Sequence, residues 1–304
     1  MFFLYPGFGK TGTTTLQEHL LSRHKDIIYF GRPFTYSESI SEFNREIRKP
    51  EGYFDGQKFK KLSESCRNEA KEGKTAIISD ATLINNYYMR GILAKRLHDA
   101  FPDAYIIFTI RNQLSAVKSY YANHGRLLRK VPAPFTGRYV SFDNWLSYSL
   151  QTWETSYPGL IDYSSSLRIY EKIFGKEKVK VFLFEEFVKN KKKFIDTLSR
   201  HLSINSDEAF YLIEGKKSNP RDSGALIKWI SIRQKLFPGI SIRQLIPGGR
   251  WLQNIFYTLV RKGKKLEVHL SKEWKDTLTE RYGPGNRLLV SNYNLPLEKY
   301  EYPL

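Results

Sequence analysis

Residues 2–21, FFLYPGFGKTGTTTLQEHLL, contain the pattern that decides the fold. Phe2 to Tyr5 form a short apolar run with strand character, and Pro6-Gly7 ends this run because both residues favour turns. From Thr13 onward, leucines recur at helical spacing, and the threonines can cap the exposed N–H groups of the first helical turn. The segment therefore predicts a strand, a glycine-rich loop and a helix in direct succession.

The loop in this segment has the composition of an anion-binding site. Its glycines allow the backbone to curl so that successive N–H groups point inward, and the following helix adds the positive end of its dipole. Lys10 adds a full positive charge, and the threonines between Thr11 and Thr15 add hydroxyl donors. An ordinary glycine-rich turn is the alternative, but a lysine between a strand and a helix favours anion binding.

Three further apolar runs alternate with helical patterns. The runs are TAIISDAT at 75–82, AYIIFTIRN at 104–112 and VKVFLFEEF at 179–187, and helical patterns follow at about 114–124 and 191–202. Strands that alternate with helices need crossover connections, so we expect a parallel sheet covered by helices on both faces. Ligands of such sheets bind beyond the carboxyl ends of the strands, which is where Lys10, Asp80 and Arg111 fall.

The composition indicates a folded chain without a membrane span. Of its 304 residues, 41% are apolar, which excludes a disordered chain and supports a large core. Cys66 is the only cysteine, and a lone cysteine provides neither an internal disulfide nor, by itself, a structural zinc site. No apolar run reaches the length of about 18 to 20 residues that a membrane span needs, and we recognise no secretion signal. We therefore expect a cytoplasmic protein.

The formal net charge is +18, and most of it is concentrated late in the chain. Residues 216–265 contain seven Lys and five Arg against one acid, Asp222, a net charge of +11. Aromatic residues interleave with these cations, namely Trp229, Phe237, Trp251, Phe256 and Tyr257. Both a solvated basic face and a surface for an anionic partner or lipid head groups fit this pattern.

Motif spacing narrows the choice of anion. The loop of nucleotide triphosphatases requires Gly, four residues and then Gly-Lys-Ser/Thr, but Leu4 stands where the first glycine belongs. The string Lys10-Thr11-Gly12-Thr13-Thr14, followed by Thr15, instead resembles the 5′-phosphosulfate loop of the sulfotransferase family. The resemblance implies that this loop binds 3′-phosphoadenosine 5′-phosphosulfate (PAPS), and that Lys10 stabilises the leaving phosphate.

A second pair of residues carries the same resemblance. In the sulfotransferase family, an arginine at a strand end and a serine eight residues later hold the 3′-phosphate, and IIFTIRNQLSAVKSYY supplies Arg111 and Ser119 at that interval. The planar fork of donors on arginine suits a phosphate. A strand-end salt bridge and a helix surface are the ordinary roles of the two residues. A late loop of the family also closes over the 3′-phosphate, and its counterpart at 215–224 offers four candidates: Lys216, Lys217, Ser218 and Arg221.

The resemblance covers nearly the whole chain and implies a single domain, residues 1–304. It implies a P-loop nucleotide-kinase-like, three-layer α/β fold with a central parallel sheet of about five strands flanked by helices. Within it we expect a core at about 1–215, a basic aromatic helical or lid segment at about 216–265 and a closing segment at about 266–304. The closing segment, GPGNRLLVSNYNLPLEKYEYP, is similar to that of bacterial-type carbohydrate sulfotransferases.

The acceptor hydroxyl needs a base, and in the carbohydrate branch of the family this is an acidic residue just after the second core strand. Asp80 stands at the matching place, although an N-cap or turn role is common for Asp at a strand end. His19 and His124 are the alternative bases. We expect no metal, because the moving sulfuryl group carries less negative charge than a phosphoryl group and in-line transfer depends mainly on positioning.

These features predict a PAPS-dependent sulfotransferase that modifies a hydroxyl or amine of a carbohydrate-like or lipid-linked acceptor and releases adenosine 3′,5′-bisphosphate. Residues 225–265 would contact the glycan or other anionic acceptor, or the inner surface of the membrane. A small-molecule kinase that uses ATP and Mg²⁺, with Asp80 as a magnesium ligand, is the main alternative. A nucleic-acid-binding protein would use the basic segment but would leave the loop at Lys10 unexplained, so we expect no nucleic-acid partner.

Overall fold

The computed structural model describes residues 1–31, 38–70, 73–84, 87–122, 133–135, 140–216, 232, 236 and 267–304. The chain divides into two compact units. The larger unit comprises Met1–Asn112, Leu160–Ser218 and Thr279–Leu304, and the smaller unit comprises Gln113–Gly159 and Asn219–Leu278. The expectation of one domain over residues 1–304 stays a prediction.

A five-stranded parallel sheet forms the centre of the larger unit, with the strand order β2-β3-β1-β4-β5. The strands are β1 (Phe2–Tyr5), β2 (Ile27–Tyr29), β3 (Thr75–Ser79), β4 (Tyr105–Ile110) and β5 (Val179–Leu183). The predicted α/β class, the parallel direction and the strand count are confirmed. The strand expected at 179–187 is shorter than predicted, because the acidic pair Glu185 and Glu186 occupies the first turn of a helix, where negative charge is favoured.

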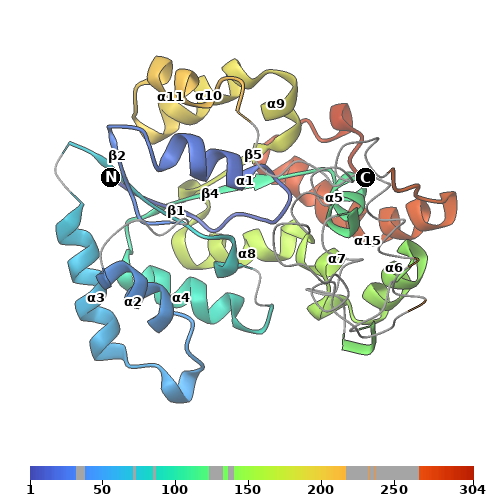
Figure 1. The fold of residues 1–304 in the computed structure, drawn as a ribbon, viewed down its shortest axis with the longest axis horizontal. Helices are drawn as coiled ribbons and strands as arrows, with labels where there is room; N and C mark the ends of the chain where they lie inside the picture. Colours follow the sequence, from blue (N-terminus) through green and yellow to red (C-terminus); the bar gives the residue numbers. More distant parts are fainter. Residues whose placement is uncertain are drawn as a thin grey trace, which may run out of the picture. The chain divides into compact units, whose positions relative to one another are not determined.

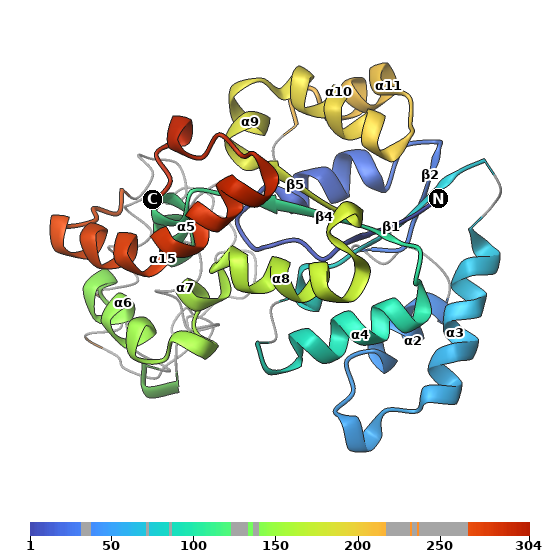
Figure 2. The same ribbon diagram turned by 180° about the vertical axis from the view of Figure 1, so that it is seen from behind.

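Helices cover both faces of this sheet (Figures 1 and 2). One face carries α1 (Thr13–Leu16), continued by one π-helical turn (Gln17–Leu21), together with α9 (Phe184–Lys189), α10 (Lys191–Leu202) and α11 (Ser206–Ile213). The opposite side carries α2 (Glu38–Glu46), α3 (Gly56–Glu69), α4 (Arg90–Ala100) and α8 (Tyr163–Phe174). The three layers therefore agree with the crossover connections that the sequence predicts.

The remaining helices of the described residues are mostly short. They are α5 (Gln113–Tyr120), α6 (Phe142–Gln151), α7 (Tyr157–Leu160), α15 (Lys272–Tyr293) and the 3₁₀ turns at Glu51–Tyr53, Ala81–Leu83, Tyr87–Met89, Ala133–Phe135, Trp153–Thr155, Lys176–Lys178 and Glu298–Tyr300. The helix expected at about 114–124 corresponds to α5. Among the described residues, no helix combines the length and the apolar character that a membrane span requires.

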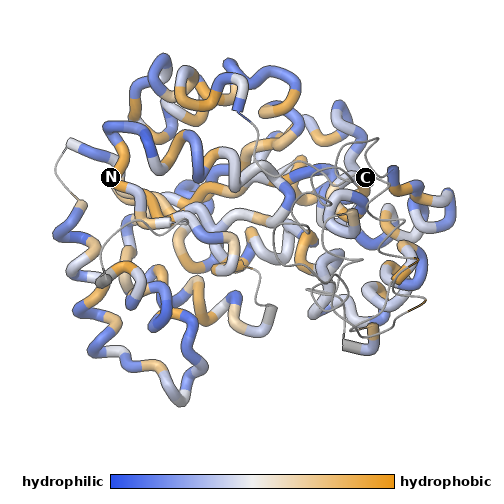
Figure 3. The backbone as a smooth tube through the Cα atoms, in the orientation of Figure 1, coloured by the Kyte–Doolittle hydropathy of each residue, from blue (hydrophilic) through white to orange (hydrophobic). Residues whose placement is uncertain are grey.

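The core beneath α1 and α10 fixes the strands in place. Phe3, Ile77, Ile107 and Phe182, which come from four different strands, are buried and pack together with leucines such as Leu20. Figure 3 shows the apolar residues running along these strands. Full burial of one such side chain stabilises the fold by about 1.5–3 kcal/mol, so the sheet is a rigid support for the loops at its carboxyl end.

Candidate functional site

The carboxyl ends of β1 and β3 lie next to each other, because Tyr5 pairs with Ser79 in the parallel register. The helix after β1 is tied to the same place, since Gln17 Nε2 donates to Ser79 Oγ at 2.8 Å. Tyr29 also approaches Ser79, and burial raises the pKa of its hydroxyl, which therefore stays protonated. The glycine-rich loop and Asp80 thus leave the sheet side by side, as the sequence predicts for ligand-binding loops.

The loop between β1 and α1 adopts a backbone that ordinary residues resist. Gly7, Lys10 and Gly12 have φ angles of 51°, 69° and 81°, in the left-handed region. A Cβ atom on Gly12 would lie 3.0 Å from the ring of Phe184, so glycine is needed there for both conformation and space. Lys10 has the same backbone without being glycine, which costs about 1–2 kcal/mol and is typical of functional loops.

The predicted threonine donors differ in their surroundings. Thr11 is buried and its hydroxyl donates to the carbonyl of Phe8 at 2.7 Å, so this side chain shapes the loop. Thr13 and Thr15 are buried as well, whereas Thr14 and Lys10 are partly exposed. Gly12 caps helix α1, since its carbonyl accepts hydrogen bonds from the N–H groups of Thr15 and Leu16. The N–H groups at the start of a helix have no carbonyl partner within it, so they can bind an anion.

Arg111 follows β4 and reaches this loop. Its guanidinium Nη1 donates to the carbonyl of Lys10 at 3.0 Å, and its Cζ lies 4.7 Å from the ring centre of Phe184. Phe184 therefore contacts two predicted site elements: Gly12 of the loop and the guanidinium of Arg111. The sequence analysis missed Phe184, and the available signal was an aromatic residue directly after β5, at a carboxyl strand end.

Asp80 is buried, and both of its carboxylate oxygens accept hydrogen bonds. Its Oδ1 accepts from the backbone N–H and the hydroxyl of Thr82 at 2.8 and 2.9 Å, which caps the turn Ala81–Leu83. Its Oδ2 pairs with Arg48 Nη2 at 2.5 Å. The N-cap role considered from the sequence is therefore present. A proton taken from a substrate would neutralise Asp80 and thereby weaken its pairing with Arg48.

The other predicted residues are distributed over several parts of the chain. Ser119 lies in α5 of the smaller unit and is buried. His19 lies in the π-helical turn, and its Nε2 is 4.0 Å from a carboxylate oxygen of Glu18. Lys216 is exposed, and its N–H donates to the carbonyl of Ile213 at 3.2 Å. Four predicted residues, Lys217, Ser218, Arg221 and His124, lie outside the described residues, as does nearly all of 225–265.

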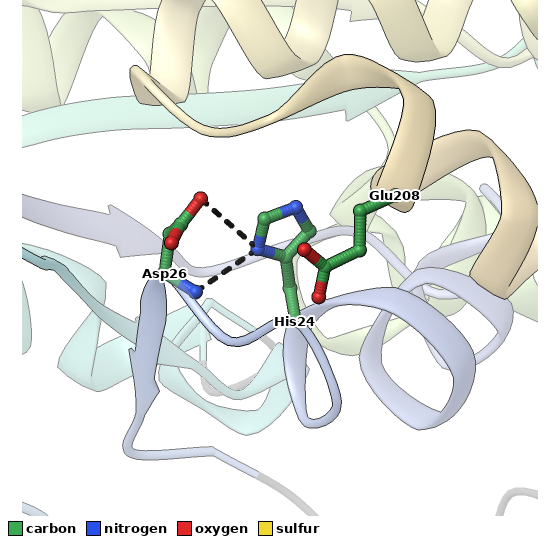
Figure 4. Close-up of side chains that lie close together, drawn as sticks. All are labelled: His24, Asp26 and Glu208. Atoms are coloured by element: carbon green, nitrogen blue, oxygen red, sulfur yellow. Dashed lines mark hydrogen bonds and ion pairs between the residues drawn. The ribbon is translucent and has the colours of Figure 1, made fainter.

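A cluster of possible metal ligands lies away from these loops: His24, Asp26 and Glu208 (Figure 4). His24 Nδ1 accepts from the N–H of Asp26 at 3.1 Å, and His24 Nε2 donates to the carbonyl of Asn205 at 2.9 Å. Glu208 accepts from the N–H of Lys25 and pairs with its ammonium group. Both imidazole nitrogens are occupied, so the cluster connects α11 to the segment before β2 and offers no histidine lone pair to a metal.

Comparison with solved structures identifies the architecture. A sulfotransferase from Alicyclobacillus acidocaldarius matches this chain with a TM-score of 0.55 at 18% sequence identity, covering 98% of this chain and 97% of that chain. The chain has a sulfotransferase fold. Weaker matches are mouse sulfotransferase SULT7A1 complexed with PAP (TM-score 0.46, 15% identity, 94% and 87% covered) and the sulfotransferase domain from the curacin biosynthetic pathway (TM-score 0.43, 11% identity, 93% and 97% covered).

No protein-family model matches the sequence, and no curated protein matches it either. The structural match shows the sulfotransferase fold. Because the sequence identity is only 18%, the reaction has to be argued from the residues of this chain. In this sulfotransferase fold, the glycine-rich loop and Arg111 are in direct hydrogen-bond contact, although about 100 residues separate them in the sequence.

Proposed function

We propose that this protein is a sulfotransferase that takes the sulfuryl group from PAPS. The observation that carries the proposal is the hydrogen bond from Arg111 to the carbonyl of Lys10. It joins Arg111, from the motif that resembles a 3′-phosphate site, to the loop that resembles a 5′-phosphosulfate site, and so supports the assignment of both to one donor nucleotide. A kinase loop would not need a second, strand-end arginine for a 3′-phosphate, and Leu4 replaces the first glycine of that loop.

The donor would be held by two sets of groups. Lys10, the N–H groups of the loop and the hydroxyls of Thr13 and Thr14 would bind the 5′-phosphate, and Thr15 would support them. Arg111 would bind the 3′-phosphate. Other candidates for the 3′-phosphate are Ser119, Lys216, Lys217, Ser218 and Arg221.

Transfer would proceed in line, with the acceptor oxygen attacking sulfur as the bond from sulfur to the bridging phosphate oxygen breaks. Lys10 would neutralise the negative charge that develops on that oxygen. Asp80 is the proposed base, and its pairing with Arg48 would weaken as it takes the proton of the acceptor. We propose that the reaction needs no metal, so a chelator should leave turnover unchanged.

We further propose a carbohydrate-like or lipid-linked acceptor with anionic character. The support is the net charge of +11 at residues 216–265, interleaved with aromatic side chains. A cytoplasmic location, with residues 225–265 at the inner membrane surface, fits the same pattern and the free, buried Cys66.

Thermal-shift measurements test the donor assignment. Adenosine 3′,5′-bisphosphate should raise the melting temperature in the absence of metal, and the shift should be lost in Lys10→Ala. Stabilisation by ATP with Mg²⁺ alone would contradict the assignment and support a kinase. Turnover of radiolabelled PAPS over a panel of glycan and lipid-linked acceptors then tests the acceptor class.

A further inference from the structure

The backbone of Arg111 is held by Tyr163, the first residue of α8. The N–H of Arg111 donates to the Tyr163 hydroxyl at 3.2 Å, and this hydroxyl donates to the carbonyl of Arg111 at 2.8 Å. Tyr163 is completely buried, and its ring meets the ring of Phe8 edge to face with the ring centres 4.6 Å apart. The peptide groups on both sides of the Arg111 Cα atom are therefore fixed to a core side chain.

The next residue, Asn112, is held from two further directions. Its N–H donates to Glu185 Oε1 at 2.9 Å, and its side-chain amide donates to the carbonyls of Tyr300 and Glu301 at 3.0 and 2.6 Å. The strand end that carries Arg111 is thus bound to α9 and to the C-terminal segment, residues 297–304.

The C-terminal segment is itself anchored through buried side chains. Leu297 and Tyr302 are buried, and the N–H of Tyr302 donates to the carbonyl of Leu297 at 3.2 Å. Asn286, also buried, donates to the carbonyl of Pro303 at 2.7 Å. The Tyr302 hydroxyl then donates to Glu185 Oε2 at 2.9 Å, so Glu185 connects the segment to Asn112 a second time.

We propose that Glu185 and Tyr302 are positioning residues that hold Arg111 in the geometry needed to bind the 3′-phosphate of the donor nucleotide. The inference rests on the proposed function. The two carboxylate oxygens of Glu185 accept from different partners: Oε1 from the Asn112 N–H and Oε2 from the Tyr302 hydroxyl. Loss of either hydrogen bond therefore removes one of the contacts that hold the end of β4. Because Arg111 is the proposed ligand of the 3′-phosphate, displacing it should weaken the binding of nucleotides that carry a 3′-phosphate and leave the binding of those without one unchanged.

Equilibrium binding of adenosine 3′,5′-bisphosphate and adenosine 5′-phosphate to the full chain tests the inference. Tyr302→Phe removes one hydroxyl, and Glu185→Leu removes both carboxylate oxygens that accept these bonds. Each variant should weaken binding of the bisphosphate about three- to tenfold and leave binding of the monophosphate unchanged. Tyr293→Phe is the matched control, because Tyr293 donates to Glu171 of α8 away from Arg111, and it should alter neither affinity.

The possible outcomes separate the inference from the proposed function. Equal weakening of both nucleotides in Tyr302→Phe would show a general structural role and overturn the inference, as would unchanged binding of both. A wild-type protein that binds the bisphosphate no better than the monophosphate would contradict the proposed function, and the inference with it. A wild-type preference that survives in both variants would overturn the inference alone.

Discussion

Replacement of Gly12 by alanine should damage the loop in two separable ways. The left-handed backbone at Gly12, with φ of 81°, costs an alanine about 1–2 kcal/mol. The new Cβ atom would also lie 3.0 and 3.1 Å from two ring carbons of Phe184, and overpacking of this kind costs about 1–3 kcal/mol. Gly12→Ala should therefore lower the free energy of unfolding by about 2–5 kcal/mol when the two effects add.

Gly73→Ala is the matched control for this prediction. Gly73 has nearly the same φ, 78°, but a Cβ atom there would meet no atom of the described residues within 4 Å. Its substitution should cost the backbone contribution alone, about 1–2 kcal/mol. The difference between the two variants then measures the contact with Phe184, and adding Phe184→Leu to Gly12→Ala should recover part of that difference.

Urea unfolding gives both free energies, and binding of adenosine 3′,5′-bisphosphate gives the functional consequence. Because Phe184 lies against the guanidinium of Arg111, Gly12→Ala should weaken nucleotide binding, whereas Gly73→Ala should leave it unchanged. If Gly12→Ala proves no more destabilising than Gly73→Ala and binds the nucleotide normally, the close approach of Gly12 to Phe184 does not shape the site.

Three further predictions concern other parts of the chain. Asp80→Asn should abolish turnover and leave donor binding unchanged. It should also lower the free energy of unfolding by about 2–3 kcal/mol, because the ion pair with Arg48 is lost. Near-normal turnover would show that Asp80 is not the base. Burial, and secondarily the charge of Lys180, lowers the pKa of His201, so the imidazole binds a proton more readily in the unfolded chain than in the folded one. The free energy of unfolding should therefore rise with pH between the lowered pKa of the folded state and the ordinary value of about 6.5. Urea titrations at several pH values should show a smaller rise for His201→Phe. Zinc should not raise the melting temperature through His24, because both ring nitrogens are hydrogen-bonded; a shift that disappears in His24→Gln would contradict this reading.

Much of the fold follows from local pattern. Phe2–Tyr5 has the predicted strand limits, and the apolar runs at 75–82 and 104–112 contain β3 and β4, because buried parallel strands are short and continuously apolar. Strand β2 was not predicted from the sequence, since three residues, Ile27–Tyr29, are too few to show a period. The strand count came from the family resemblance.

The candidate site was predictable where one residue type stands at one spacing, as for Lys10 and Arg111, which a hydrogen bond joins in the structure; their roles in donor binding stay predictions. It was not predictable where the role of a residue depends on a distant partner. Arg48 is the example: its pairing with Asp80 spans 32 residues, and no local signal distinguishes a buried, paired Asp80 from an available base. Phe184 and Glu185 likewise acquire their roles from the folding of β4 and β5 side by side.

The bond between Arg111 and the carbonyl of Lys10 makes the two ends of the proposed donor site thermodynamically dependent on each other. Any ligand that draws the guanidinium away from this carbonyl changes the energy of the left-handed backbone at Lys10, and any ligand that reshapes the loop changes the position of the guanidinium. Linkage requires that the two effects be equal in free energy. A nucleotide with phosphates at both ends would therefore bind with an affinity that its two halves, measured separately, do not predict.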